Sequence, residues 1–121
     1  HRVRNLSLSR ALGDRYAKPV VSAQVDIQHY PVQEETDEFV LLASDGLWDV
    51  MTSQDVVSYV HKRMAQELAK IPNDDENRAS AELVVRRNMS KYVAREALRR
   101  GTADNVCVLM VWLNDIPNDE R

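Results

Sequence analysis

The sequence predicts a mixed α+β fold, with strands near both ends of the chain and helices in its middle. Uninterrupted apolar runs at Phe39–Ala43 and Val106–Leu113 are typical of short buried strands. Between them, apolar residues recur at every fourth position over two long segments, which is the spacing of amphipathic helices. The chain has 121 residues, of which 44% are hydrophobic and 29% charged. We therefore expect residues 1–121 to belong to one modest globular domain.

The first expected strands lie on either side of a polar turn. From Val25 to Val32 apolar and polar residues partly alternate, which predicts a half-exposed strand. Residues 34–37 then form a solvated turn. The run Phe39–Ala43 does not alternate, so we expect a strand that is covered on both faces. A turn at Ser44–Gly46 follows directly and places Asp45 at a strand end.

The first helix is expected from about Gln54 to Leu68. Thr52 or Ser53 is a good N-cap, and Asp55 falls in the first turn, where an acidic residue is favourable. The core-facing stripe of this helix consists of four residues spaced by four, namely Val56, Val60, Met64 and Leu68.

A polar loop and a second helix are expected next. Residues Pro72–Asn77 combine a helix breaker with turn formers and a run of negative charge, so they predict an exposed loop. The second helix begins near Ser80 and ends at Gly101, a residue type common after a helix C-terminus. Its buried face is predicted to contain Val85, Met89, Val93 and Ala97.

The last expected strand, Val106–Leu113, is too continuously apolar for an exposed strand. Cys107 lies within it and is expected to pack as a small core residue, since a single cysteine cannot form an internal disulfide. So few strands leave sheet edges and apolar faces that another element must cover. The sequence therefore has the features expected of half a domain.

Charge and hydropathy argue against two classes of partner. The net charge is −3, and the Lys and Arg residues are scattered except at Arg86-Arg87 and Arg99-Arg100, so there is no basic footprint for nucleic acid. No apolar stretch approaches the roughly 20 residues that span a bilayer, and the N-terminus has no apolar signal core. We expect a protein without nucleic-acid or membrane partners, located in the cytoplasm, the nucleus or both.

Two carboxylates at strand ends suggest a metal site. Asp45 opens Asp-Gly-Leu-Trp-Asp directly after one apolar run, and Asp104 stands just before the other. A rigidly held carboxylate at such a position is a suitable hard ligand for a divalent cation. Asp104 lies within Gly-Thr-Ala-Asp-Asn at Gly101–Asn105, and one further segment, Ser-Arg-Ala-Leu-Gly-Asp at Ser9–Asp14, precedes both carboxylates.

In this order, the segments resemble the C-terminal half of the metal-dependent protein serine/threonine phosphatases of type 2C, the PPM family. The resemblance is carried by residues 8–14, 38–51 and 101–113. It implies the α/β/β/α sandwich of that family, a central β-sandwich flanked by helices, of which this chain would supply the C-terminal portion. It also implies that Asp45 and Asp104 are ligands of a binuclear Mg²⁺ or Mn²⁺ centre, and that Asp49 is associated with an additional, weaker metal site. Thr102 stands where the family often has Ser and keeps a hydroxyl in the turn.

The implied activity is hydrolysis of phosphoserine or phosphothreonine in a phosphoprotein substrate. Two ions that retain bound waters need only a few carboxylates and supply a nucleophilic water for in-line attack on phosphorus. The family's N-terminal half brings a bridging aspartate in Asp-Gly-His-Gly, a phosphate-binding arginine and a candidate general-acid histidine, and nothing in this sequence matches them. We expect the chain alone to be inactive and the missing half, possibly a separate chain, to be its partner.

Two alternatives remain open from the sequence. One is a pseudophosphatase that keeps the fold as a binding or scaffold module. The other is an unrelated small sandwich domain that matches by chance.

Other residues receive structural roles. Arg10 and Asp14 are expected to shape a turn by hydrogen bonding, and Asn105 to orient the loop that carries Asp104. The two tryptophans, Trp48 and Trp112, are expected to pack. No general acid is assigned to the histidines, which are His1, His29 and His61.

Overall fold

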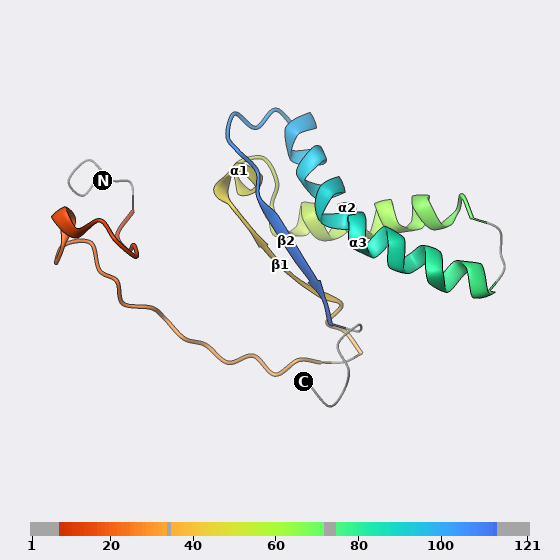
Figure 1. Ribbon diagram of the computed structural model, residues 1–121, viewed down its shortest axis with the longest axis horizontal. Helices are drawn as coiled ribbons and strands as arrows, with labels where there is room; N and C mark the ends of the chain where they lie inside the picture. Colours follow the sequence, from red (N-terminus) through yellow and green to blue (C-terminus); the bar gives the residue numbers. More distant parts are fainter. Residues whose placement is uncertain (1–7, 34, 72–74, 114–121) are drawn as a thin grey trace. The chain divides into compact units, whose positions relative to one another are not determined.

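A computed structural model gives the structure, which describes residues 8–33, 35–71 and 75–113 (Figure 1). The chain divides after Val32 into two compact units. The first is small and made largely of loops, and the second contains the sheet and the long helices. Among the helices of the described residues, none is both long and apolar enough to cross a bilayer.

The first unit is built around a tight turn. Its described residues include one helical element, the 3₁₀ turn η1, Arg15–Ala17, preceded by Gly13 and Asp14 with φ of 94° and 49°. A parallel bridge joins Arg10 to Ser22, with Ala11 N–H donating to Ser22 O at 2.9 Å. Ala17 and Val21 are fully buried and form the small apolar centre of this unit.

The prediction of a strand at Val25–Val32 is wrong. These residues are assigned to no strand, and the apolar side chains of the segment are exposed. Alternation alone does not make a strand, because a strand requires a hydrogen-bonded neighbour. Within the described residues this segment joins no ladder.

The second unit contains a two-stranded antiparallel sheet of β1, Phe39–Ala43, and β2, Val108–Trp112. The register pairs Phe39 with Trp112 and Ala43 with Val108, so the end of β1 meets the start of β2. The prediction of strands in these two regions is confirmed, although β2 is shorter than the apolar run that predicted it. Cys107 precedes β2 and is exposed, so its predicted place in the core is wrong.

Within the described residues both strands are covered on one face only, which contradicts the prediction that Phe39–Ala43 is covered on both faces. Residues alternate between partly buried and exposed along each strand. An unbroken apolar run shows that both faces avoid water, but it does not show what covers them. Within the described residues, one face therefore remains open, and its side chains are Val40, Leu42, Leu109 and Val111.

The predicted first helix is confirmed as α2, Ser53–Leu68. Thr52 is its N-cap: its side chain accepts a hydrogen bond from Asp55 N–H, and the Asp55 carboxylate accepts one from Thr52 N–H. This reciprocal capping box satisfies two backbone donors that the helix itself cannot pair. Before it stands the short helix α1, Asp45–Trp48, where the sequence predicted only a turn.

The second long helix is α3, Asp75–Arg99, and it starts earlier than predicted. The predicted loop Pro72–Asn77 is therefore wrong for its last three residues, while residues 72–74 lie outside the described part. Acidic residue types suit the first turn of a helix as well as a loop, because the positive end of the helix dipole attracts them.

The core of the second unit lies between the helices and one face of the sheet (Figure 1). All four apolar residues predicted for the buried face of α3 are buried. Trp112 packs edge-on against Phe39 with ring centroids 5.3 Å apart, which confirms its packing role. Trp48 is 40% exposed and donates to Ala43 O at 3.3 Å. The fully or nearly fully buried residues are Leu47, Met51, Val56, Val60, Val85, Met89, Val93 and Ala97.

Candidate metal-binding site

The end of β1 is joined to the loop before β2 through Ser44. Its N–H donates to Cys107 O at 3.1 Å, and its hydroxyl oxygen accepts a hydrogen bond from Cys107 N–H at 3.0 Å. The same hydroxyl donates to Asn105 O at 3.2 Å. These three hydrogen bonds fix the residue before Asp45 against the residues that follow Asp104.

Gly46 brings the same two segments into direct contact. A Cβ atom at this position would lie 2.3 Å from Asn105 O and 3.5 Å from Asp104 Cβ. The first separation is far below a van der Waals contact, so only glycine fits at this position without movement of the backbone. The glycine that follows Asp45 therefore packs directly on the segment that carries Asp104.

The structure thus places Asp45 and Asp104 on adjoining segments, and both side chains are exposed. Asp104 Oδ1 accepts a hydrogen bond from Asn105 N–H at 2.7 Å. Asp104 N–H donates to Thr102 Oγ1 at 3.4 Å, so the hydroxyl expected in this turn is present. Asn105 holds the loop through its main chain, since its N–H bonds Asp104 and its carbonyl bonds Ser44.

Asp49 follows the last residue of α1, and its N–H donates to Asp45 O at 2.8 Å. Residues four apart on a helix are neighbours on one face, and two like charges there repel each other. Within the described part of the chain, no Lys or Arg forms an ion pair with Asp45, Asp49 or Asp104. Exposed carboxylates without a cationic partner fit a hard divalent cation.

The described residues do not form a complete ligand set. Among residues 8–33, 35–71 and 75–113, no three His, Cys, Asp or Glu side chains are grouped closely enough to hold an ion. His61 Nε2 lies 3.1 Å from Glu38 Oε1. His29 is exposed and belongs to the first unit. His1 lies outside the described residues. The structure therefore brings together two of the predicted ligand segments, and no third donor group completes a site.

Arg10 and Asp14 belong to the first unit. Arg10 forms an ion pair with Asp26, and Asp14 O accepts a hydrogen bond from Ala17 N–H at 2.8 Å. Both residues thus take part in local turn structure, as predicted.

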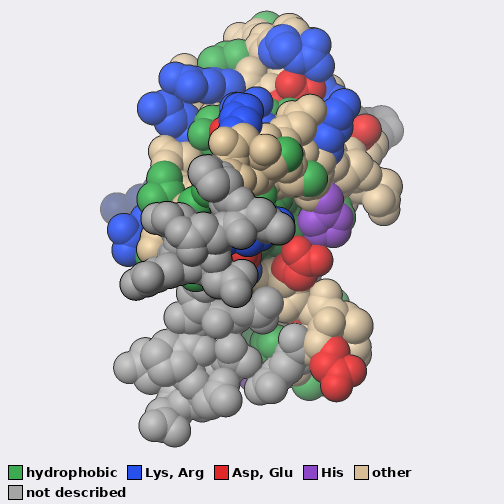
Figure 2. Space-filling model, turned by 90° about the vertical axis from the view of Figure 1, so that its right-hand side faces the viewer, with side chains coloured by type: hydrophobic (Ala, Val, Ile, Leu, Met, Phe, Trp, Pro, Cys, Tyr) green, Lys and Arg blue, Asp and Glu red, His purple; other side chains and the backbone are tan. Residues whose placement is uncertain are grey.

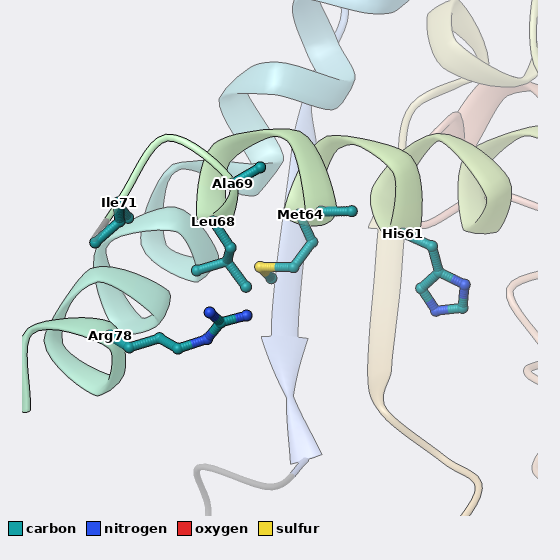
Figure 3. A pocket seen from close by; sticks show the side chains of 7 residues that line it. His61, Met64, Leu68, Ala69, Ile71 and Arg78 are labelled. Atoms are coloured by element: carbon teal, nitrogen blue, oxygen red, sulfur yellow. The ribbon is translucent and has the colours of Figure 1, made fainter. Parts of the chain in front are cut away.

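One recess of the second unit lies away from the carboxylate site. Its volume is about 690 Å³, and it lies along the C-terminal half of α2, where Met64 and Leu68 point into it (Figure 3). Arg78 of α3 reaches toward the same space, and among the described residues that line it there is no carboxylate. This apolar composition is unlike a magnesium or manganese site, whose ligands are oxygens.

Sequence reasoning from single residues missed Ser44 and Gly46. Both were interpreted only as turn residues. Their contacts are made with the loop before β2, which is distant in the sequence. The residues around Ser44 and Gly46 therefore give no indication of these contacts.

The fold and site define an α+β protein that presents carboxylates where the two strands of a sheet begin and end. Comparison with solved structures gives the same architecture. A structure described as that of a C. elegans sex determining protein matches with a TM-score of 0.71 and 31% identity, over 93% of this chain and 24% of that one.

Comparison with known sequences identifies the family. The model of the family Protein phosphatase 2C matches residues 1–106. Among curated proteins of Arabidopsis thaliana, Probable protein phosphatase 2C 27 is 38% identical over 117 residues, and Protein phosphatase 2C 77 is 36% identical over 120. They are matched over 93% and 92% of this chain, respectively, and the chain spans 27% of the length of each.

The chain belongs to the protein phosphatase 2C family. Its described fold is consistent with a C-terminal part of the α/β fold of that family, as the resemblance predicted.

Proposed function

We propose that this chain is the C-terminal part of a Mg²⁺- or Mn²⁺-dependent domain that hydrolyses phosphoserine and phosphothreonine in proteins. In this proposal Asp45 and Asp104 are ligands of the binuclear centre, and Asp49 serves an additional, weaker ion. The supporting observation is the contact through Ser44 and Gly46, which holds the two segments carrying Asp45 and Asp104 side by side.

In this proposal the side chains of this chain bind the metal ions and hold them in position, and they do not attack the substrate. Bound Mg²⁺ or Mn²⁺ supplies Lewis acidity to a phosphoryl oxygen and lowers the pKa of water. Asp45 and Asp104 offer exposed oxygens on segments fixed by main-chain contacts, so their positions are set before an ion arrives. Asp104 keeps one hydrogen bond from Asn105 N–H, which limits rotation of its carboxylate.

The open face of the sheet supports a second half of the domain as partner. Val40 and Val111 are paired across the strands, as are Leu42 and Leu109, and all four are exposed. A sheet buries its apolar face against another layer, and a second sheet is one of the stable solutions. With its ligands incomplete, the chain alone should bind metal weakly and have no phosphatase activity.

The test is complementation. The 121-residue chain and a separately made N-terminal half of the same parent are assayed for hydrolysis of an aryl phosphate, alone and mixed, with and without Mn²⁺. Activity that appears only on mixing and only with Mn²⁺ is expected, as is its loss on Asp104→Asn. Unchanged turnover after Asp104→Asn would refute the ligand assignment. A stable, folded and inactive complex would instead support a pseudophosphatase that acts as a scaffold.

A further inference from the structure

The outer face of α3 carries basic side chains at every fourth position. Residues four apart lie on one helix face, so these side chains form a single row, which we call the basic stripe. All of them are exposed, whereas the opposite face of α3 forms part of the core. At 1.5 Å per residue the stripe is about 18 Å long. Its members are Arg87, Lys91, Arg95 and Arg99.

Most of this charge is not neutralised by the protein. Arg99 pairs with Glu96 at 2.7 Å, but the other three cations form no ion pair with any described residue. The chain as a whole has a net charge of −3, so the stripe is a local feature and not a result of composition. Lys and Arg side chains gather in the upper part of the face shown in Figure 2.

At its C-terminal end the stripe opens into a recess between α2 and α3 with a volume of about 330 Å³. Tyr59 donates its hydroxyl to Tyr92 O at 3.3 Å, which fixes the two helices here. The Arg63 guanidinium lies 4.3 Å above the centroid of the Tyr92 ring. The recess therefore combines aromatic walls with guanidinium groups. Arg63 pairs with Glu67 at 2.6 Å and Arg99 with Glu96 at 2.7 Å, whereas Arg95 forms no ion pair with a described residue. The recess is lined by Tyr59, Arg63, Tyr92, Arg95, Glu96 and Arg99.

We propose that the basic stripe and this recess form a docking surface for an acidic peptide segment of a partner protein. The charge of the stripe is complementary to such a segment, and an extended peptide of five or six residues matches its length of about 18 Å. The aromatic walls of the recess can hold the alkyl part of one side chain while the guanidinium groups bind its carboxylate.

An acidic peptide fits this surface better than a membrane or a nucleic acid does. Leu83, Val84 and Leu98 are exposed on α3, but basic residues separate them along the helix. Insertion into a bilayer requires a continuous apolar face. A single row of cations on a protein of net charge −3 is also a small footprint for nucleic acid.

The test uses the 121-residue chain and a fluorescein-labelled decapeptide of glutamate, with binding followed by fluorescence anisotropy. One variant removes three cations of the stripe, Arg87→Gln, Lys91→Gln and Arg95→Gln. A matched variant removes three exposed cations elsewhere, Arg15→Gln, Lys62→Gln and Lys70→Gln. Both variants change the net charge equally, and glutamine preserves helix propensity, which circular dichroism verifies.

Binding of the glutamate peptide should weaken about tenfold in the stripe variant and less than twofold in the matched variant, since each exposed charge contact contributes a modest factor. Arg63→Gln in the recess should weaken it about threefold. Equal weakening in the two triple variants, or no binding by the unmodified chain, would overturn the proposal. Tighter stripe-dependent binding to phosphatidylserine vesicles or to a DNA duplex would overturn the choice of an acidic peptide.

Discussion

The position where a Cβ atom of residue 46 would stand lies 2.3 Å from the carbonyl oxygen of Asn105. Gly46 directly follows Asp45, and Asn105 directly follows Asp104. The absence of a side chain at one residue therefore lets the two candidate ligand segments lie against each other. The glycine at position 46 is therefore what allows the segments of Asp45 and Asp104 to lie side by side.

Replacement of Gly46 by alanine should separate the two segments. The new methyl group cannot fit unless the backbone at Asn105 moves, and such overpacking costs about 1–3 kcal/mol. We expect a lower free energy of unfolding in urea and a loss of Mn²⁺-dependent activity in the complemented domain.

Gly101 provides the matched control. Its φ is +87°, and no atom lies within 4 Å of its Cβ position, so alanine there is strained by backbone conformation and not by lack of space. Asparagine tolerates this conformation and should restore most of the stability at Gly101, but it should not do so at Gly46. Equal tolerance of asparagine at both positions would contradict the close-contact explanation.

The carboxylates should bind Mn²⁺ even in the isolated chain, although weakly. We expect added Mn²⁺ to broaden the NMR amide signals of Asp45 and Asp104 at the same metal concentration, because one ion near both segments relaxes both. Asp45→Asn or Asp104→Asn should reduce this broadening at both segments together. Asp49→Asn should have a smaller effect, since the proposed site of Asp49 is separate and weaker.

Asp37→Asn is the control for this titration, because Asp37 is an exposed carboxylate of the same unit that accepts a hydrogen bond from Gln33 N–H at 2.9 Å. It should leave the broadening at Asp45 unchanged. Independent broadening of the two segments, at different Mn²⁺ concentrations, would argue against a shared ion.

Ser44→Ala should weaken the connection between β1 and the loop before β2. The substitution leaves Cys107 N–H and Asn105 O without the hydroxyl that bonds both. We expect the free energy of unfolding to fall by about 1–2 kcal/mol. In contrast, Ser58→Ala removes only an acceptor for Gln54 Nε2 at 3.4 Å on the exposed face of α2 and should change stability little. If the two substitutions lowered the free energy of unfolding equally, the Ser44 hydrogen bonds would not contribute specially to stability.

The predictable parts of this fold are those that the sequence encodes locally. Thr52 and Asp55 lie three residues apart and cap α2 by themselves, so its start was predicted nearly to the residue. The buried face of α3 follows from the spacing of Val85, Met89, Val93 and Ala97 in the same way. In each case the signal is contained in one helix.

The missed features depend on contacts between distant segments. Val25–Val32 has strand-like residues but no partner strand within the described chain, and the outer face of β1 has no covering layer there. Cys107 is exposed because it lies two residues before Leu109, on the face of the sheet that stays open within the described residues. At the site, Asp45 and Asp104 were paired by resemblance to a family, whereas the contacts of Ser44 and Gly46 became visible only when the strands were paired.

Glu96 should make the stability of the second unit dependent on pH. Its side chain is 8% exposed, and it accepts hydrogen bonds from Arg99 at 2.7 Å and Arg100 at 3.0 Å. The two hydrogen bonds from Arg99, followed by the one from Arg100, lower the pKa of Glu96 from 4.5 to about 2. Because the pKa is lower in the folded state, the stabilisation is complete well above pH 4.5 and is lost as the pH falls toward 2.

Glu96→Gln should therefore lower the free energy of unfolding by about 2 kcal/mol at pH 7. The difference from the unmodified chain should shrink between pH 5 and pH 2, because the glutamate then becomes neutral as well. This difference in free energy of unfolding is measured by urea unfolding. The fluorescence of Trp48 and Trp112 follows the transition, since both residues lie in the second unit. Glu82→Gln removes the pair with Arg86, in which the carboxylate side chain is 38% exposed, and should change stability by less than about 1 kcal/mol. A Glu96→Gln effect that stays constant from pH 7 to pH 2 would mean that packing, and not the charge of Glu96, stabilises this end of α3.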